Sequence, residues 1–201
     1  MKNLILACSL VFSATVNASL ISTDWLNAND GLITTDTASG LDWLDLSETY
    51  GMRLADASAL FGTTFAGFRF ATHTEVLGFM GHAGLPTPAS PFNSTVSSGN
   101  AAHIAAQQLM TSLVGETVGA GFGTTYFGSR GLVSELSALV GSYLINGTTL
   151  HVDNPCCNDG HPGAGVWLVR ASRYVAAPEP TTVALLGLSV AGLGFSRRKA
   201  A

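Results

Sequence analysis

Lysine is almost missing from this chain: only Lys2 and Lys199 occur, and both lie close to the ends. Residues 19–177 contain five arginines, no lysine and twelve acidic residues, which gives this stretch a formal charge of about −7. Proteins that bind nucleic acids neutralise phosphates with lysine and arginine. A surface of the opposite sign repels phosphate backbones, so the composition argues against nucleic acid as a partner.

Long apolar runs are also missing, because none reaches the ~20 residues that a membrane-spanning helix needs. The first run, residues 4–16, follows the single charge of Lys2 and ends at the small residues of Val16-Asn17-Ala18. This order is typical of a secretory signal peptide. We predict a signal peptide over residues 1–18, removed by signal peptidase so that the mature chain begins at Ser19. The alternatives are an N-terminal anchor, or a lipoprotein at Cys8, which lies too early to follow a complete apolar region.

The second apolar run, residues 181–195, lies near the C-terminus. As a helix it would be roughly 22 Å long, against a hydrocarbon core of ~30 Å. Arg197 and Arg198 follow it and predict a cytoplasmic C-terminus by the positive-inside rule. Pro178 and Pro180 precede it and keep the backbone there extended. The pattern predicts a C-terminal transmembrane helix that holds only weakly in the bilayer.

Residues 177–201 resemble the PEP-CTERM sorting domain in three parts that occur in order. These are Pro178-Glu179-Pro180, the apolar helix, and Arg197-Arg198. The resemblance implies recognition by an exosortase, a membrane peptidase or transpeptidase of Gram-negative bacteria that make exopolysaccharide. It implies export across the inner membrane, transient anchoring by the helix, and release to the cell surface or the extracellular space. A plain C-terminal anchor is the alternative.

Residues 19–176 form the predicted exported domain, and about 160 residues suffice for one domain with a core. Trp25, Trp43, Trp167 and eight of the chain's ten phenylalanines lie in this stretch and supply core material. The pattern of apolar and turn residues predicts the following elements: short strands and turns over 19–48, a helix over 52–61, a helix capped by Thr72 and Glu75, a loop over 84–100, a helix over Ala101–Val114, turns around a strand over 119–131, a hairpin over 143–152 with Asn146-Gly147 at its turn, and a final strand over 165–171.

The helix over 101–114 has the clearest apolar spacing. Ile104, Ala105, Leu109 and Leu113 are predicted to face the core, and Gly115 is predicted to end the helix.

Three segments resemble DUF1566-type (Lcl C-terminal) domains, which are related to C-type lectins. Ser39 to Trp43 fits Thr-Gly-Leu-x-Trp, and Gly67 to Thr72 fits Gly-x-x-Trp-Arg-Leu-Pro-Thr with Phe for Trp and Ala for Pro. Trp167 to Arg170 fits the closing aromatic-x-Val-Arg. The resemblance implies an α+β, C-type-lectin-like single domain of short antiparallel strands with two or three helices, in which N- and C-terminal strands pair. It also implies three core residues: Trp43, Phe68 and Trp167.

Candidate catalytic groups are few. Asp36, Asp42 and Asp45 lie close in sequence, but acidic residues beside turns are usually solvated. His73, His82 and His103 are scattered, and the chain has no Gly-x-Ser-x-Gly elbow. It also lacks the Glu-Pro-Asn and Gln-Pro-Asp tripeptides of calcium-dependent lectins. We therefore predict no catalytic residue and no cofactor.

The densest cluster of candidate ligands is the stretch HVDNPCCNDGH, residues 151–161. Its imidazole, thiol and carboxyl groups are typical of zinc or copper ligands: His151, Asp153, Cys156, Cys157, Asp159 and His161. Adjacent cysteines rarely share one metal, however, and an exported protein meets oxidising conditions. A vicinal disulfide between Cys156 and Cys157, unpaired or intermolecularly linked thiols, and a metal site remain the three alternatives. We predict that no transition metal binds tightly.

These patterns lead to one functional hypothesis and two alternatives. We expect a non-enzymatic, exosortase-processed surface or extracellular-matrix protein that binds exopolysaccharide or another surface protein. The alternatives are a secreted hydrolase and a structural matrix protein without a specific ligand.

Overall fold

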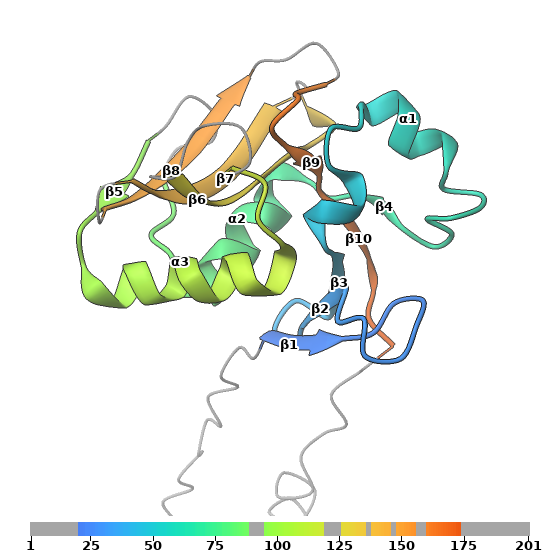
Figure 1. Ribbon diagram of the computed structural model, residues 1–201, viewed down its shortest axis with the longest axis horizontal. Coiled ribbons are helices and arrows are strands. Elements are labelled where there is room, and N and C mark those ends of the chain that lie inside the picture. Colours follow the sequence, from blue (N-terminus) through green and yellow to red (C-terminus); the bar gives the residue numbers. More distant parts are fainter. Residues whose placement is uncertain are drawn as a thin grey trace, which may run out of the picture.

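The computed structural model describes residues 20–88, 95–118, 126–135, 138–145, 148–155 and 160–173. Within these ranges the chain has an α+β fold with two five-stranded sheets and three α-helices (Figure 1). The helical elements are the 3₁₀ helix η1 (Leu46–Thr49), α1 (Leu54–Ala59), α2 (His73–His82) and α3 (Ala101–Val114).

The first sheet gathers strands from both ends of the domain. Its order is β1 (Leu20–Thr23), β2 (Ile33–Asp36), β3 (Leu41–Leu44), β10 (Leu168–Ala171) and β4 (Arg69–Phe70), and all neighbours are antiparallel. The pairing of β10 with β3 confirms that N- and C-terminal strands pair. Leu20, Asp36, Leu41 and Ala171 lie opposite one another in register. The described domain therefore begins and ends at the same end of this sheet, three strand spacings or roughly 14 Å apart.

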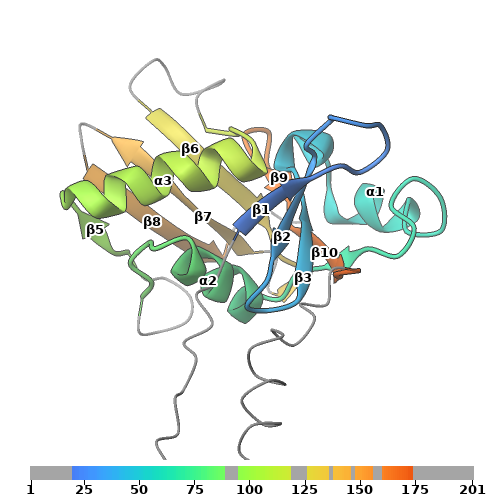
Figure 2. The ribbon, with the colours of Figure 1, turned by 90° about the horizontal axis from the view of Figure 1, so that it is seen from below.

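The second sheet lies beside the first. Its order is β5 (Ser97–Ser98), β8 (Thr148–Pro155), β7 (Ala138–Ile145), β6 (Tyr126–Leu132) and β9 (Gly165–Val166), with β6 and β9 parallel and the rest antiparallel. Ile145 pairs with Thr148, which confirms the predicted hairpin with a two-residue connection. Helix α3 crosses the face of β6, β7 and β8 (Figure 2).

The predicted final strand is interrupted at Trp167, where the chain leaves one sheet for the other. Its backbone N–H donates to the Leu132 carbonyl of the second sheet at 3.0 Å, and its carbonyl accepts from Ala71, which follows β4, at 2.8 Å. The indole N–H donates to the Val140 carbonyl on β7 at 2.9 Å. The prediction of one continuous strand over 165–171 was therefore wrong. The backbone N–H of Trp167 bonds to the second sheet, and its carbonyl bonds to the residue after β4 in the first sheet.

Both faces of the first sheet are covered, which explains why β3 is buried along most of its length. Trp43 and Val169 point into a core shared with α2, α3 and the second sheet. Leu44 and Leu168, the neighbours of Trp43 and Val169 on these strands, point into a second core with α1. Figures 1 and 2 show α1 on one side of β3 and β10 and the two longer helices on the other. The implied core residues Trp43, Phe68 and Trp167 are all buried.

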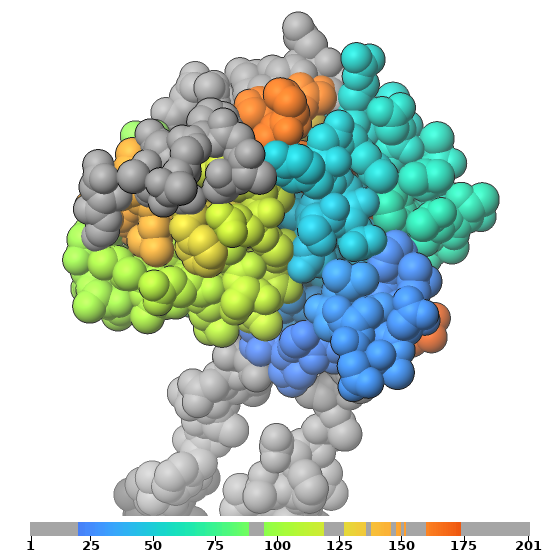
Figure 3. Space-filling view, viewed as in Figure 1, coloured from blue at the N-terminus to red at the C-terminus, as the bar shows by residue number. Residues whose placement is uncertain are grey.

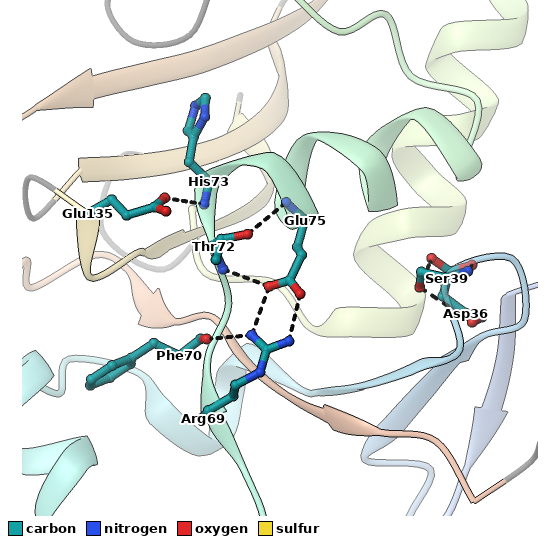
Figure 4. Close-up of polar contacts among 8 residues, drawn as sticks. All are labelled: Asp36, Ser39, Arg69, Phe70, Thr72, His73, Glu75 and Glu135. Atoms are coloured by element: carbon teal, nitrogen blue, oxygen red, sulfur yellow. Dashed lines mark hydrogen bonds and ion pairs between the residues drawn. The ribbon is translucent and has the colours of Figure 1, made fainter.

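Helix α2 begins as the sequence predicts. Thr72 Oγ1 accepts from Glu75 N–H and Glu75 Oε2 accepts from Thr72 N–H, which closes a capping box (Figure 4). Arg69 holds the same carboxylate with two hydrogen bonds of 2.8 and 2.6 Å, and the pKa of Glu75 falls to about 2, chiefly because of Arg69. Glu135 accepts from the His73 N–H at 2.5 Å, so the β6–β7 connection also holds this helix end.

Helix α3 has the predicted bounds and ends at Gly115, whose φ is +81°. Its predicted core face was only partly right: Leu113 is partly buried and packs against the core, and Ile104 is also partly buried, but the other two predicted residues are not. Leu109 is 50 % exposed and Ala105 is also exposed. The buried stripe lies next to the predicted one: Ala106, Gln107, Met110, Thr111 and Val114. Two polar residues of this stripe fix the rotation of α3 about its axis. The Gln107 amide donates to the Ser142 carbonyl on β7 and to Thr111, both at 3.0 Å.

Several predictions fall outside the described ranges, namely those for residues 1–18 and 177–201, including the helix over 181–195. The domain boundaries at residues 18 and 176 stay predictions. Among the helices of the described ranges, none combines the length and apolar character needed to cross a bilayer.

We expect Trp167→Phe to lower the free energy of unfolding by about 2–4 kcal/mol, because it leaves the Val140 carbonyl without its donor and opens a space in the core. Urea unfolding of the purified exported chain measures the change. Tyr50→Phe, at an aromatic residue that is 40 % exposed, is the control and should stay within about 0.5 kcal/mol of the parent. Equal midpoints for the two variants would contradict the role of the indole.

Candidate functional site

A cleft of about 420 Å³ opens where four distant segments meet beside the first sheet. We call it the Trp25 cleft. Residues 23–26 at the end of β1 contribute one side, and residues 63–66 after α1 contribute another. β3 contributes Asp42, β10 contributes Arg170, and Arg173 follows β10. In Figure 3 the orange-red end of β10 lies at the right-hand edge, next to the blue residues of the β1–β2 segment. The volume falls within the ~300–1,000 Å³ that small-molecule sites occupy.

The loop that carries Trp25 is organised by one carboxylate. Asp30 accepts backbone N–H groups from Trp25, Leu26 and Asn27 at 2.8 to 2.9 Å, and from Leu32 at 3.2 Å. These bonds, led by those of Asn27 and Trp25, lower the pKa of Asp30 from 3.8 to about 2. The ionised Asp30 therefore holds the loop in shape.

Trp25 lines the cleft and also packs against the second core. Its ring stacks on Phe65 with centroids 5.8 Å apart and meets the Phe68 ring edge-on at 6.2 Å. Phe65 and Phe68 are buried, whereas Trp25 is only partly buried. Trp25 therefore supplies core material with only part of its indole, because its neighbours cover only part of the ring. The indole is thus positioned and still accessible.

An ion pair fixes the inner part of the cleft. Arg170 Nε donates to Asp42 Oδ2 at 3.2 Å, and the guanidinium lies over the Phe68 ring at 4.8 Å. Asp42 is 2 % exposed, and its other oxygen accepts from Thr35 Oγ1 at 2.8 Å. Asp42 lies directly opposite Thr35 on one neighbouring strand and Arg170 on the other, so the three side chains face the same side of the sheet. The ion pair and the Phe68 ring hold Arg170 in one orientation.

The Trp25 cleft combines groups that suit recognition better than bond breaking. It offers a fixed aromatic surface, the hydroxyls of Thr63 and Thr64, and charged groups at its inner end. A site of this kind can pack against an apolar ring face while its polar groups bond to hydroxyls or charges at the ring edge.

The other predicted carboxylates serve the fold. Asp36 is fully buried at the end of β2, where it accepts from Ala38 N–H, Ser39 Oγ and the His82 ring (Figure 4 shows Asp36 with Ser39). Asp45 caps η1 by accepting from Ser47 N–H at 2.8 Å. Of the three aspartates, only Asp42 lines the cleft.

The histidines are as scattered as the sequence suggests. His82 pairs with Asp36 at 2.8 Å, His103 contacts Ser98 Oγ at 2.7 Å, and His73 is buried in the first turn of α2. In the ranges that the structure describes, no group of three His, Cys, Asp or Glu residues is placed to hold a metal ion.

The stretch 151–161 is described only at its ends. His151 is buried on β8, and His161 lies in a second cleft of about 340 Å³ with Arg53. Burial and the charge of Arg130 lower the pKa of His161. Cys156 and Cys157 lie outside the described residues, so the disulfide, thiol and metal alternatives stay open. The sorting residues Pro178, Glu179, Pro180, Arg197 and Arg198 also lie outside them.

Comparison with known proteins identifies the C-terminal segment. Residues 176–199 match the PEP-CTERM protein-sorting motif, which confirms that part of the sequence analysis. The motif implies an exported protein that an exosortase processes and sorts to the cell surface. No curated protein and no solved structure matches the chain. The DUF1566-type resemblance thus gains no support, and the C-type-lectin-like fold stays a prediction.

The sequence analysis missed most of the Trp25 cleft. Thr63, Thr64 and Arg173 carry no local signal, and Arg170 pairs with a residue 128 positions away. The one available signal was local: Trp25 stands just before an Asn-Asp-Gly turn, a place where the chain is usually at the surface.

We expect acid to loosen the loop that carries Trp25. Because the pKa of Asp30 is lowered, its contribution is complete above the unfolded value of 3.8 and is lost as the pH falls toward about 2. Acrylamide quenching of Trp25, taken as the difference between the parent and Trp25→Phe, should rise over this range. Asp30→Ala should show the higher quenching already at neutral pH. Equal quenching of Asp30→Ala and the parent at neutral pH would contradict the role of Asp30.

Proposed function

We propose that the exported domain is a non-enzymatic module that binds polysaccharide in the Trp25 cleft, on a surface protein sorted by an exosortase. The ligand we propose is the exopolysaccharide of the producing bacterium. The observation that carries this proposal is the placement of Trp25, which a stacked Phe65 and the Asp30-held loop fix at the edge of an open, largely polar cleft.

The chemistry of sugars fits this placement. A pyranose ring has an apolar face of C–H groups and an edge of hydroxyls, so a ring against the indole leaves its hydroxyls to polar neighbours. Thr63 and Thr64 supply hydroxyls, and Asp24 supplies a carboxylate. Charged and hydroxyl side chains around one aromatic ring give orientation as well as contact area.

The hydrolase alternative finds less support in the described residues. Ser39 Oγ and the His82 ring both bond to Asp36 Oδ2, at 2.6 and 2.8 Å, so the serine and the histidine share one carboxylate. Activation of a serine nucleophile needs the histidine between the serine and the carboxylate. The contacts of Asp36 instead close the β2–β3 turn.

The cleft proposal is tested by binding to the polysaccharide that the producing bacterium secretes. We expect Trp25→Ala to weaken binding at least about tenfold, because the stacking surface is lost. Affinity electrophoresis of the exported protein in gels that contain this polysaccharide measures the effect. Ala66→Gln, at an exposed position of the cleft, should weaken binding without touching the core.

Tyr50→Ala is the matched control, since Tyr50 is an exposed aromatic residue outside the cleft. It should bind as the parent does. Binding that survives both cleft variants would overturn the proposal, as would retention of a surface protein in place of polysaccharide.

The sorting segment gives a separate prediction. Changing Pro178 and Glu179 to alanine should leave residues 181–201 attached and hold the protein in the inner membrane, because the change removes the recognised peptide and preserves the apolar run. Mass spectrometry of fractionated cells measures the mass of the tail. A strain without its exosortase is the control and should retain the tail of the parent. Parent chains that keep the tail while an exosortase is active would contradict this prediction.

A further inference from the structure

The exported domain has few positive charges, and they are unevenly placed. Of its five arginines, Arg69 is bound to Glu75 and Arg130 is buried on β6. Arg53 is exposed in the second cleft. The remaining two, Arg170 and Arg173, both line the Trp25 cleft. In a stretch with a formal charge of about −7, this cleft is where an anion meets two guanidinium groups together.

Arg170 is set up to receive an anion. Its Nε–H donates to Asp42, and its guanidinium packs on the Phe68 ring, so the side chain is held in place before any ligand binds. Among the described residues, no hydrogen bond uses its two terminal nitrogens. These nitrogens form the edge of the fork that bonds to planar carboxylates.

Arg173 supplies the second positive charge. It is exposed, and no described residue forms an ion pair with it. The acidic residues of the cleft are Asp42, already engaged by Thr35 and Arg170, and Asp24, which accepts from Gly31 N–H at 3.1 Å. Asp42 neutralises part of the charge of Arg170 from the buried side, so Arg173 faces the solvent with the larger uncompensated charge.

We propose that the Trp25 cleft selects a carboxylated glycan, whose uronic-acid carboxylate binds to Arg170 and Arg173 while its pyranose ring packs on Trp25. This inference rests on the proposed glycan-binding function and adds the chemical class of the sugar. A neutral glycan would leave Arg173 without a counter-charge and the terminal nitrogens of Arg170 without an acceptor. The net negative charge of the domain repels an acidic glycan, and the exposed charge of Arg173 attracts it at this cleft.

The test compares uronate polymers with their own neutral forms. The probes are polygalacturonate, alginate and glucuronan, each beside the same polymer after reduction of its carboxyl groups to alcohols, which keeps ring and linkage. We expect at least one parent polymer to bind the exported protein and to lose about tenfold in affinity on reduction, as for the loss of a charge-assisted contact. Raising the ionic strength should weaken binding of the parent polymer and leave binding of the reduced polymer unchanged.

Variants then locate the charge. Arg173→Gln should weaken binding of the acidic polymer about tenfold and remove most of its salt dependence. Arg170→Lys keeps the positive charge beside Asp42 but loses the planar guanidinium group. It should therefore also weaken binding of the acidic polymer. Arg53→Gln, an exposed arginine outside the cleft, is the matched control and should have no effect.

The outcomes separate this inference from the proposed function. If reduced and acidic polymers bind equally and Trp25→Ala abolishes both, glycan binding stands and selection for carboxylate is wrong. If Arg53→Gln weakens binding as much as Arg173→Gln, the effect is one of overall charge, and the cleft is not its origin. If no polymer binds and the secreted polysaccharide also fails to bind, both proposals are wrong.

Discussion

Trp167 joins the two halves of this domain through all three of its polar groups. Its backbone N–H and carbonyl bond to opposite sides, and its indole N–H bonds to the second sheet. Gly131 on β6 makes room for the ring, since a Cβ there would lie 2.9 Å from an indole carbon. Because β10 continues directly from Trp167, this residue fixes where Arg170 lies. The position of the cleft thus depends on the crossing between the sheets.

The sequence predicted best those features that neighbouring residues decide. The capping box of Thr72 and Glu75 and the stop at Gly115 need only a few residues of context, and both occur as expected. The face of α3 could not be predicted in this way. Its helix has two apolar stripes side by side, and the hydrogen bond from Gln107 to a strand 35 residues away selects between them.

The cleft could not be predicted from local sequence patterns either, because contacts between distant residues form it. The alternation along β3 and β10 sends Trp43 and Val169 to one core and Leu44 and Leu168 to the other. Asp42 and Arg170 occupy the same kind of position as Leu44 and Leu168, yet they are charged. A charge on a core-facing position is tolerated only when a partner arrives from elsewhere in the chain. Only the register of β3 against β10 shows that each is the partner of the other.

The closeness of the cleft to the end of the domain has a mechanical consequence. A surface protein that is held at its C-terminal side would carry load between that side and a ligand in the Trp25 cleft. Arg170 lies on β10, and the described part of the domain ends at Arg173, so tension between a ligand in the cleft and the C-terminal side would pass along a few residues of one strand. β10 is flanked by β3 and β4. Pulling along its axis loads the hydrogen bonds to both neighbours in shear, all at once, while the second sheet and its helix α3 lie outside the path of the force.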